Sequence, residues 1–384
     1  MTAAATIAAV DAPPRAVYIH VPFCRHHCGY CNFTVVAGRD DLVPAYLDAI
    51  ERELSWLETP REVDTLYFGG GTPTRLAIDD FSRLVRTVRN WHPLAAGNEW
   101  TVEANPADLS AGLVEALVQF GVTRLSIGGQ SFRVEKLKLL ERDHAPEAIA
   151  ESVRLARGAG LDVSLDMIFA TPGETLADWQ RDLGEAIELA PEHISAYGLT
   201  FERGTTFWNR REKRDLVESD EELQREMYEW TIDELSSAGF EHYEVSNFAR
   251  PGKRSRHNEN YWSGGGYYAA GPGAARYVDG MRETNHRSTT TYLKHVLAGE
   301  SPVAERERLN PEQRARERLI FGLRRLEGVH RAAFQSATGF EIDQLAGREL
   351  RRYVQMGLLQ DDGHRVCLTR DGLLVSDAMW PELL

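Results

Sequence analysis

The 384-residue chain contains few cysteines, and their placement excludes one class of protein. It has four in all, and three of them lie between Cys24 and Cys31. Small secreted domains that depend on disulfides are dense in cysteine and distribute it along the chain. Clustered thiols in a long chain instead indicate metal ligation, whereas Cys367, alone in an apolar run, is expected to be a buried structural thiol.

The chain also lacks a long apolar run and an excess of basic residues. No stretch of about 20 apolar residues is present, so we expect no transmembrane segment. The formal net charge of −14 disfavours a nucleic-acid partner and an anionic membrane surface, because like charges repel. Residues 1–15 lack a basic n-region and contain Asp11 and two prolines, so we interpret them as a disordered leader of a cytoplasmic protein and not as a signal peptide.

Six short segments have the composition of buried β-strands, and amphipathic helical segments lie between them. Each is rich in β-branched or aromatic residues and ends in polar or glycine-rich sequence. This alternation predicts βα units around a parallel sheet, and six units predict an α/β fold with an incomplete (β/α)6 TIM-like barrel. The chemistry of such a fold is at the C-terminal ends of the strands. The expected strands are 16–23, 64–70, 99–106, 123–129, 162–170 and 193–200, and the clearest helices are 41–57, 106–121 and 146–160.

Beyond residue 285 the strand signals become sparse and charged helices dominate. The last segments predict a helix over 347–357, a hairpin over 358–369 with its turn near Asp362 and Gly363, and a helix over 370–380. This order resembles a winged-helix module, although the acidic wing disfavours nucleic acid. We therefore expect a leader at 1–15, a barrel at 16–245, a connecting segment at 246–285 and a C-terminal α-helical, winged-helix-like domain at 286–384.

Cys24, Cys28 and Cys31 form a C-x3-C-x2-C motif directly after the first expected strand. Three thiolates on one tight loop can ligate three irons of a [4Fe–4S] cluster, which leaves the fourth iron open for another ligand. A zinc site completed by His26 or His27 is the rival interpretation. Structural zinc sites usually pair two such knuckles, and the sequence contains no clear second one, so the cluster is favoured.

Glycine and polar residues follow the later strands. The glycines of the segment 69–73 would let the backbone approach a ligand closely. Glu103 ends the third strand, where a carboxylate can accept hydrogen bonds from ribose hydroxyls. Gln130, Arg142 and Asp166 lie at or near later strand ends. Together they favour a ligand site beside the cysteine loop.

A second candidate segment, 257–262, lies outside the six units and precedes a glycine-rich stretch. Its aromatic residues could receive a large flat ligand, and His257 could bind iron. From the residue types alone, a packed structural loop is the better interpretation.

Nearly the whole chain resembles the coproporphyrinogen-oxidase-like branch of the radical S-adenosylmethionine (SAM) superfamily. Within that branch it is more similar to the heme chaperones than to the oxygen-independent coproporphyrinogen dehydrogenases. The dehydrogenase pattern has a further cysteine at the position that Phe33 occupies in this chain. The dehydrogenases also have a longer N-terminal segment. The matching segments are YIHVPFC, CRHHCGYCNF, YFGGGTPT, EANP, RLSIGGQSF, SLDMIFATPGET, HISAYGLT, YEVSNFA and HNENYW.

This resemblance implies a radical SAM barrel, its cofactors and the residues that bind them. It implies a [4Fe–4S] cluster on the three clustered cysteines and heme at the HNxxYW segment, which reverses the interpretation drawn from residue types. The implied SAM residues are Tyr18, Tyr30, Gly70, Gly71, Thr72, Glu103, Gln130, Arg142 and Asp166, and the implied heme residues are His257, Asn258, Tyr261 and Trp262.

The expected function is that of a heme chaperone, which binds heme and transfers it to an acceptor protein. An electron donor for the cluster is the other expected partner. Two alternatives remain open at this stage. One is a radical SAM enzyme acting on a tetrapyrrole, such as an oxygen-independent coproporphyrinogen III dehydrogenase, and the other is a radical SAM methylase or cyclopropanase.

Overall fold

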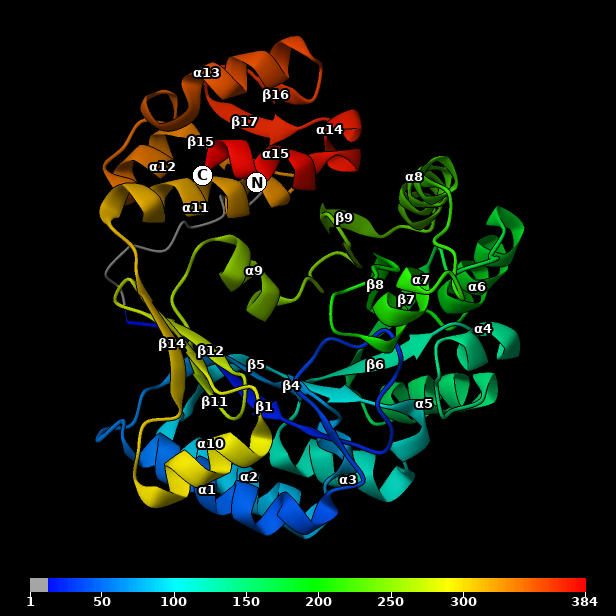
Figure 1. Ribbon diagram of the computed structural model, residues 1–384, viewed down its shortest axis with the longest axis vertical. Coiled ribbons are helices and arrows are strands. Elements are labelled where there is room, and N and C mark those ends of the chain that lie inside the picture. The colour runs from blue at the N-terminus through cyan, green and yellow to red at the C-terminus, as the bar shows by residue number, and fades with distance from the viewer. Residues whose placement is uncertain (1–12) are drawn as a thin grey trace.

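The computed structural model describes residues 13–384, and most of the leader expected at 1–15 lies outside them. Its main body is an open, curved sheet with helices along its outer face (Figure 1). All six expected strands are present and pair in parallel, in chain order, which confirms the incomplete barrel. They are β1 (Ala16–Val21), β4 (Val63–Gly70), β5 (Leu94–Ala104), β6 (Arg124–Gln130), β7 (Asp162–Phe169) and β8 (His193–Gly198).

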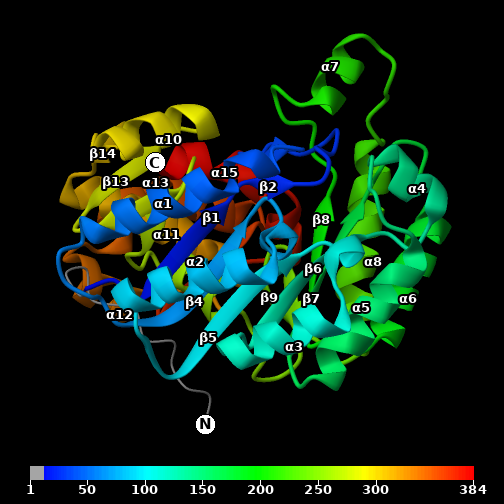
Figure 2. The same cartoon turned by 90° about the horizontal axis from the view of Figure 1, so that it is seen from below.

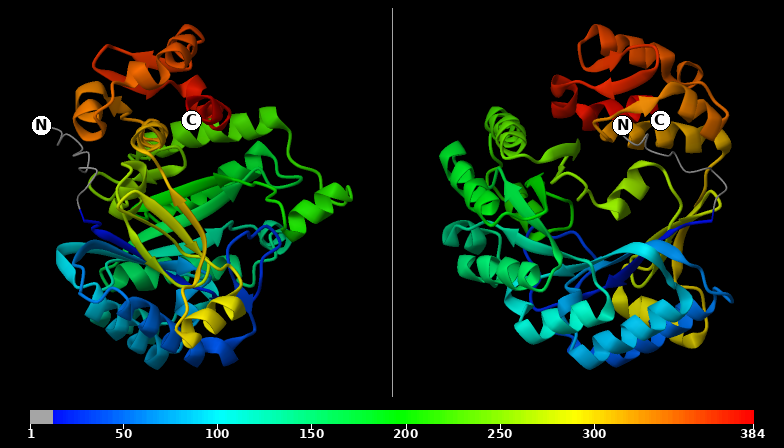
Figure 3. Two further views of the ribbon diagram at one scale, coloured as in Figure 1. Left: turned by 60° about the vertical axis from the view of Figure 1, so that its left-hand side comes forward. Right: turned by 180° about the vertical axis from the view of Figure 1, so that it is seen from behind.

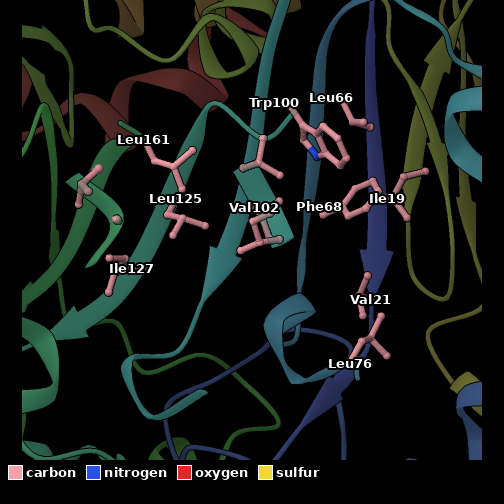
Figure 4. Packing of buried hydrophobic residues seen from close by; sticks show 14 of the residues in the cluster. Ile19, Val21, Leu66, Phe68, Leu76, Trp100, Val102, Leu125, Ile127 and Leu161 are labelled. Atoms are coloured by element: carbon pink, nitrogen blue, oxygen red, sulfur yellow. The ribbon is translucent and has the colours of Figure 1, made fainter. Parts of the chain in front are cut away.

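The two faces of this sheet have different chemistry. Because successive side chains of a strand point to opposite faces, one set of alternate residues packs under the helices. That set is apolar and includes Ile19, Phe68, Trp100 and Leu125, all fully buried (Figure 4). The other set points into the barrel and is largely polar, so the inner face can bind polar ligands.

Seven helices contribute buried side chains to the core on the outer face (Figures 2 and 3). Their ends follow from local sequence: Ser110 accepts a hydrogen bond from the N–H of Leu113 at one N-terminus, and Gly121, with φ of 95°, ends the same helix. The seven are α1 (Val43–Ser55), α2 (Ile78–Trp91), α3 (Ala111–Phe120), α5 (Pro146–Gly158), α6 (Leu176–Glu188), α8 (Glu221–Ser237) and α10 (Thr289–Ala298). Two shorter helices, α4 (Val134–Leu139) and α7 (Thr206–Glu212), follow β6 and β8.

Several strands were not expected from the sequence. β11 (Tyr268–Ala270) pairs in parallel with the outer edge of β1, and β10 (Asn247–Ala249) and β9 (Glu241–Glu244) extend the other edge. The main sheet therefore has the order β11-β1-β4-β5-β6-β7-β8-β10-β9. A separate sheet contains β12 (Ala275–Val278), β13 (Met281–Asn285) and β14 (Val303–Arg308), and a short pair joins β2 (Phe23–Cys24) to β3 (Val36–Ala37).

These strands are short or polar, and β11 pairs with a strand that is remote in the sequence, which explains why no local pattern revealed them. The expectation that strands become sparse beyond residue 285 was wrong for β14, whose residues 304–308 are charged or small and exposed. The short helix α9 (Arg256–Trp262), which carries the HNxxYW segment, contacts β4 of the main sheet.

The C-terminal residues form a second core, which confirms a helical, winged-helix-like domain. The expected hairpin is present with its turn at Asp362–Gly363, and Cys367 is buried. The expected final helix was wrong as one element, because Val375 leaves helical geometry and divides it. The domain contains α11 (Pro311–Arg324), β15 (Val329–His330), α12 (Arg331–Thr338), α13 (Ile342–Gln355), β16 (Leu359–Asp361), β17 (Arg365–Leu368), α14 (Arg370–Leu374) and α15 (Ser376–Leu383).

Among residues 13–384, none of the helices combines the length and the apolar character needed to cross a lipid bilayer.

Candidate functional site

A cavity of about 550 Å³ occupies the inside of the barrel at the C-terminal ends of the strands. We call it the thiol cavity, because Cys24, Cys28 and Cys31 all line it. The expected ligand residues that share its lining are Tyr30, Gly70, Gly71, Thr72, Glu103, Gln130, Arg142 and Asp166. The chain thus brings together residues from five of the six expected strand ends.

The cysteine loop is polar around its thiols although it is partly buried. Burial raises the pKa of the Cys24 thiol to about 12, an effect partly offset by the Thr72 hydroxyl 3.5 Å from its Sγ. The guanidinium of Arg142 is also buried and lies 3.5 Å from Sγ of Cys28, while its other arm donates to the Gly128 carbonyl at 2.9 Å. A fixed cation stabilises a thiolate, so this loop suits metal ligation. Loading it with metal would release the thiol protons.

The placement of the thiols bears on how this loop could hold a metal. Within the described residues, no group of three or more His, Cys, Asp or Glu side chains is placed to share a single metal ion. His26 instead lies 3.8 Å from Glu141. A zinc ion needs its ligands at one centre, whereas in a cubane cluster each thiolate binds a different iron. Three thiols on one loop that line the same cavity therefore fit a [4Fe–4S] cluster.

The glycine segment after β4 is required by close packing. Gly70 has φ of 105°, and a Cβ there would lie 2.3 Å from the ring of His20. A Cβ on Gly71 would meet backbone atoms of residues 21–23 at 2.7–2.8 Å. His20 is itself fixed by hydrogen bonds to Tyr18 and to the Thr34 carbonyl. At Gly70 and Gly71, the wall of the thiol cavity therefore consists of backbone atoms without side chains.

Tyr18 is the one expected SAM residue that does not line the thiol cavity. Its ring lies 5.9 Å from that of Tyr67, which does line it. Tyr67 was missed by sequence reasoning, although it follows the alternation of β4 onto the inner face.

Glu103 projects into the cavity from the end of β5. Its two oxygens accept hydrogen bonds from the Tyr67 hydroxyl and the Gly70 N–H, both at 2.9 Å. Burial raises the pKa of this carboxyl to about 7 despite those hydrogen bonds. Asp166 is close enough to raise it further, and burial also raises the pKa of Asp166 to about 6. Two buried carboxyls of this kind are acceptors for hydroxyl donors.

Gln130 owes its position to a bulge in the sheet. The pairing of β6 with β7 shifts register between Gly128 and Gln130, and Gln130 has a φ of 66°. A bulge redirects the side chain that follows it, and a positive φ at a residue other than glycine is uncommon enough to indicate a constrained site. The strand end is thereby bent toward the cavity.

Helix α9 lies at the open side of the barrel, where its N-terminus is fixed by a carboxylate. Glu99 of β5 accepts the N–H groups of Arg256 and His257 at 3.1 and 3.0 Å, and Ser255 caps the helix. An anion at this end stabilises a helix through its unpaired N–H groups. Asn258, one turn into the helix, lines the thiol cavity.

His257 points in another direction and is buried. Its Nδ1 is hydrogen-bonded to the Thr65 hydroxyl at 2.9 Å, and its Nε2 to the Tyr261 hydroxyl at 2.8 Å. The ring lies 5.1 Å from that of Tyr67, and desolvation lowers the pKa of the imidazole to about 3. The side chain is therefore neutral, and both of its nitrogens already have partners.

Tyr261 and Trp262 line a second cavity of about 410 Å³. We call it the aromatic cavity, because Tyr267, Tyr277 and Phe321 complete much of its wall. The backbone of glycines 264–266 and the guanidinium groups of α11 also line it. No short motif could have revealed this cavity, because its wall comes from α9, the β12–β13 hairpin and α11. Helix α9 thus contributes residues to the walls of both cavities.

Comparison with protein families gives two matches. Residues 18–186 match the Radical SAM superfamily, and residues 309–375 match the HemN C-terminal domain.

Curated relatives match over nearly the whole chain. The chain is 33% identical over 372 residues to the heme chaperone HemW of Lactococcus lactis subsp. lactis, with 97% of each chain covered. It is also 33% identical over 381 residues to the heme chaperone HemW of Escherichia coli, with 96% of this chain and 98% of the relative covered. Among solved structures, it is similar to coproporphyrinogen III oxidase HemN from Escherichia coli, with a TM-score of 0.85, 22% identity and coverage of 98% and 92%. At that identity the structural match supports the fold alone.

Proposed function

Because this chain belongs to the family of the heme chaperone HemW, within the radical SAM superfamily, we propose that it binds heme and transfers it to an acceptor protein. The single observation that carries the proposal is the position of α9. This helix bears the HNxxYW residues and contributes Asn258 to the thiol cavity and Tyr261 and Trp262 to the aromatic cavity.

Superfamily membership implies a [4Fe–4S] cluster and SAM, and the thiol cavity fits both. We assign the cluster to Cys24, Cys28 and Cys31. When bound, the pair supplies one-electron chemistry at the SAM sulfonium. The chain's own contribution is to hold and shield them: Arg142 lies beside a thiol, and the bare backbone of Gly70 and Gly71 admits the methionine end.

The other residues of the thiol cavity have roles that follow from their donors and acceptors. Glu103 is proposed to accept hydrogen bonds from the ribose hydroxyls, replacing part of its hydrogen bonding to Tyr67. Thr72, Gln130 and Asp166 are placed to satisfy the remaining polar groups of SAM, and Tyr30 closes the wall beside the cluster. When bound, SAM would exclude water from these groups.

We propose that heme lies in the aromatic cavity, against Tyr261 and Trp262. A porphyrin is flat and apolar with two carboxylates, and aromatic side chains beside cationic ones suit that chemistry. The indole N–H of Trp262 is buried and has no hydrogen-bond partner among residues 13–384, which leaves a donor beside the cavity. His257 and Asn258 would then shape the wall, because Nε2 of His257 can ligate iron only if its hydrogen bond to Tyr261 breaks.

An anaerobic heme titration of cluster-reconstituted protein, followed by the Soret absorbance, tests this function. Saturable binding near one heme per chain is expected, and Trp262→Leu should weaken it by about tenfold, since an aromatic contact and its buried area are lost. Trp56→Leu, at an exposed tryptophan of the barrel, is the matched control and should leave the affinity unchanged. Without saturable binding the chaperone proposal fails, and turnover of coproporphyrinogen with SAM and a reductant becomes the next assay.

A further inference from the structure

Helix α11 of the C-terminal domain packs on α9 and forms one wall of the aromatic cavity (Figure 1). Arg314, Arg318 and Phe321 of this helix all line the cavity. Residues at positions i, i+4 and i+7 lie on one face of an α-helix, so the two guanidinium groups are neighbours on the cavity side. The ring of Phe321 lies 6.3 Å from that of Trp262. This wall of the cavity therefore combines two cations with an aromatic ring.

The guanidinium of Arg314 has no partner within residues 13–384. No carboxylate lies within ion-pair distance of it, and its Nε–H is buried without an acceptor. The indole N–H of Trp262 is a second donor of the lining without an acceptor, while no buried side-chain acceptor of the described lining lacks a donor. A buried donor without a partner costs free energy, so both groups indicate a ligand that supplies acceptors.

The charges of the other two arginines of the cavity are placed differently. Arg282 lies 2.6 Å from Glu317 and 3.1 Å from Glu307, so its charge is already neutralised. Arg318 is buried, and desolvation lowers the pKa of its guanidinium. An anion beside such a group stabilises its charged form. Arg314 and Arg318 are therefore the groups of this cavity best placed to bind an anionic ligand.

The same cavity offers little to a metal ion. Heme iron is usually held by histidine, cysteine, methionine or tyrosine. Among the described residues of the lining there is no histidine, cysteine or methionine, and the hydroxyl of Tyr261 is already bonded to His257. Burial raises the pKa of the phenols of Tyr267 and Tyr277, which disfavours the phenolate that ferric iron would bind. The edge and the face of a porphyrin therefore have more partners here than its metal has.

We propose that the aromatic cavity recognises a porphyrin through two carboxylates on one edge, which Arg314 and Arg318 bind, and through its flat apolar face, so that iron is not required. Arginine suits this role because it forms paired hydrogen bonds with a carboxylate. The ligand class is a dicarboxylic porphyrin, with or without a metal. A tetracarboxylic porphyrin such as coproporphyrin would bring its other carboxylates against the aromatic part of the wall, where their desolvation is costly. The inference rests on the proposed heme site and specifies what that site recognises.

The first test changes the ligand and leaves the full-length chain unaltered. Heme, iron-free protoporphyrin IX, its dimethyl ester and coproporphyrin are titrated in one buffer with a constant amount of detergent, and quenching of tryptophan fluorescence reports binding. The iron-free diacid should bind within about tenfold of heme, and the ester and coproporphyrin about tenfold or more weaker than the diacid, because charged hydrogen bonds are lost or carboxylates are buried. Equal affinity for ester and diacid would overturn the inference, and so would heme that binds more than about tenfold tighter than the iron-free diacid.

The second test changes the chain. Arg314→Met removes the charge with little change in side-chain length, and it should weaken binding of the diacid by about tenfold while the ester stays within about twofold. Arg308→Met, at an exposed arginine of β14 that does not line the cavity, is the matched control and should change neither affinity. Equal losses for diacid and ester in Arg314→Met would mean that the arginine only shapes the wall, against the inference. If no porphyrin binds at all, the proposed function fails; if heme binds but ester and diacid are equal, this inference alone fails.

Discussion

The thiol cavity and the aromatic cavity share the helix α9, yet they are built in opposite ways. The first takes its wall from consecutive βα units, whose strand ends meet at one edge of the sheet. The second is lined mainly by residues from the stretch 261–282 and by α11 of the C-terminal domain. The first is suited to a resident cofactor held by fixed polar groups, and the second to a ligand that enters and leaves between two parts of the molecule.

The prediction with the largest expected effect tests whether the two cavities bind their ligands independently. Cys28→Ala removes one of three thiolates and should abolish cluster assembly, because two thiolates do not hold a cubane. Heme affinity should change less than about twofold, since the aromatic cavity contains none of the thiols. Iron and acid-labile sulfide analysis, together with the Soret titration, measures both. Cys367→Ala, at the buried cysteine of the C-terminal domain, is the control and should retain its iron. Loss of both the cluster and heme binding in Cys28→Ala would contradict independent binding by the two cavities.

A buried ion network lies directly after β6, the strand that ends at Gln130, and should give the next largest effect. Nζ of Lys136 lies 2.5 Å from Glu174 and 3.0 Å from Asp182, and Asp182 also accepts from Ser131 and from the N–H of Phe132, just after β6.

Replacing this lysine by methionine leaves two buried carboxylates without a cation. We expect a loss of about 3–5 kcal/mol in the free energy of unfolding of the barrel, measured by urea denaturation. Arg154→Met, which breaks an exposed ion pair with Glu151, is the control and should cost less than about 1 kcal/mol. A loss of less than about 1 kcal/mol in the free energy of unfolding for Lys136→Met would show that the network does not stabilise the cavity wall.

The carboxyls of the thiol cavity should make the stability of the metal-free chain depend on pH. The pKa of Glu103 is raised from 4.5 to about 7, so the folded chain binds its proton more tightly than the unfolded chain does. Its stabilising contribution is therefore complete below about pH 4.5 and is lost as the pH rises through about 7.

Cavity water screens this carboxyl, so we expect a loss of about 1–3 kcal/mol between pH 4.5 and 7.5 from Glu103. Glu103→Gln should flatten that part of the profile, as followed by thermal unfolding across the pH range. Glu151→Gln, at an exposed glutamate, should leave the profile unchanged. A profile that is equally steep in Glu103→Gln would mean that other groups control it.

The smallest effect is expected from removal of a hydrogen bond that holds His257 in place. Thr65→Val removes the hydroxyl bonded to Nδ1 of His257 and leaves the Tyr261 bond intact, so heme affinity should fall by only about two- to fivefold. The Soret maximum should stay in place in this variant and in His257→Ala. A shifted maximum in His257→Ala alone would identify the histidine as an iron ligand, and the two cavities would then be linked through it.

The two cavities also differ in how well the sequence predicts them. Strand ends of a parallel sheet converge, so Cys24, Glu103 and Asp166 could be assigned to one site from their positions after buried segments. Tyr67 was missed because one tyrosine in a strand carries no signal of its own. Gln130 required a bulge between β6 and β7 that composition does not encode.

The aromatic cavity could not be derived from the residues, because it depends on tertiary packing. Tyr261 and Trp262 were identified only by resemblance, and Tyr277 and Phe321 were not identified. The same cause hid β11, a three-residue strand whose partner lies far back in the sequence. The kink at Val375 is a local departure from helical geometry that the residue types did not predict.

The late arrival of β11 has a consequence for synthesis on the ribosome. One edge of β1 remains unpaired until residues 268–270 emerge, roughly 250 residues later. At about 5–20 residues per second, that edge is open for roughly 12–50 seconds. An unpaired, apolar strand edge is a template for wrong pairing between nascent chains. Because α9 directly precedes β11 in the chain, the pairing of β11 with β1 also fixes the position of α9. A chain truncated before Tyr268 would leave this edge of β1 unpaired and α9 unanchored.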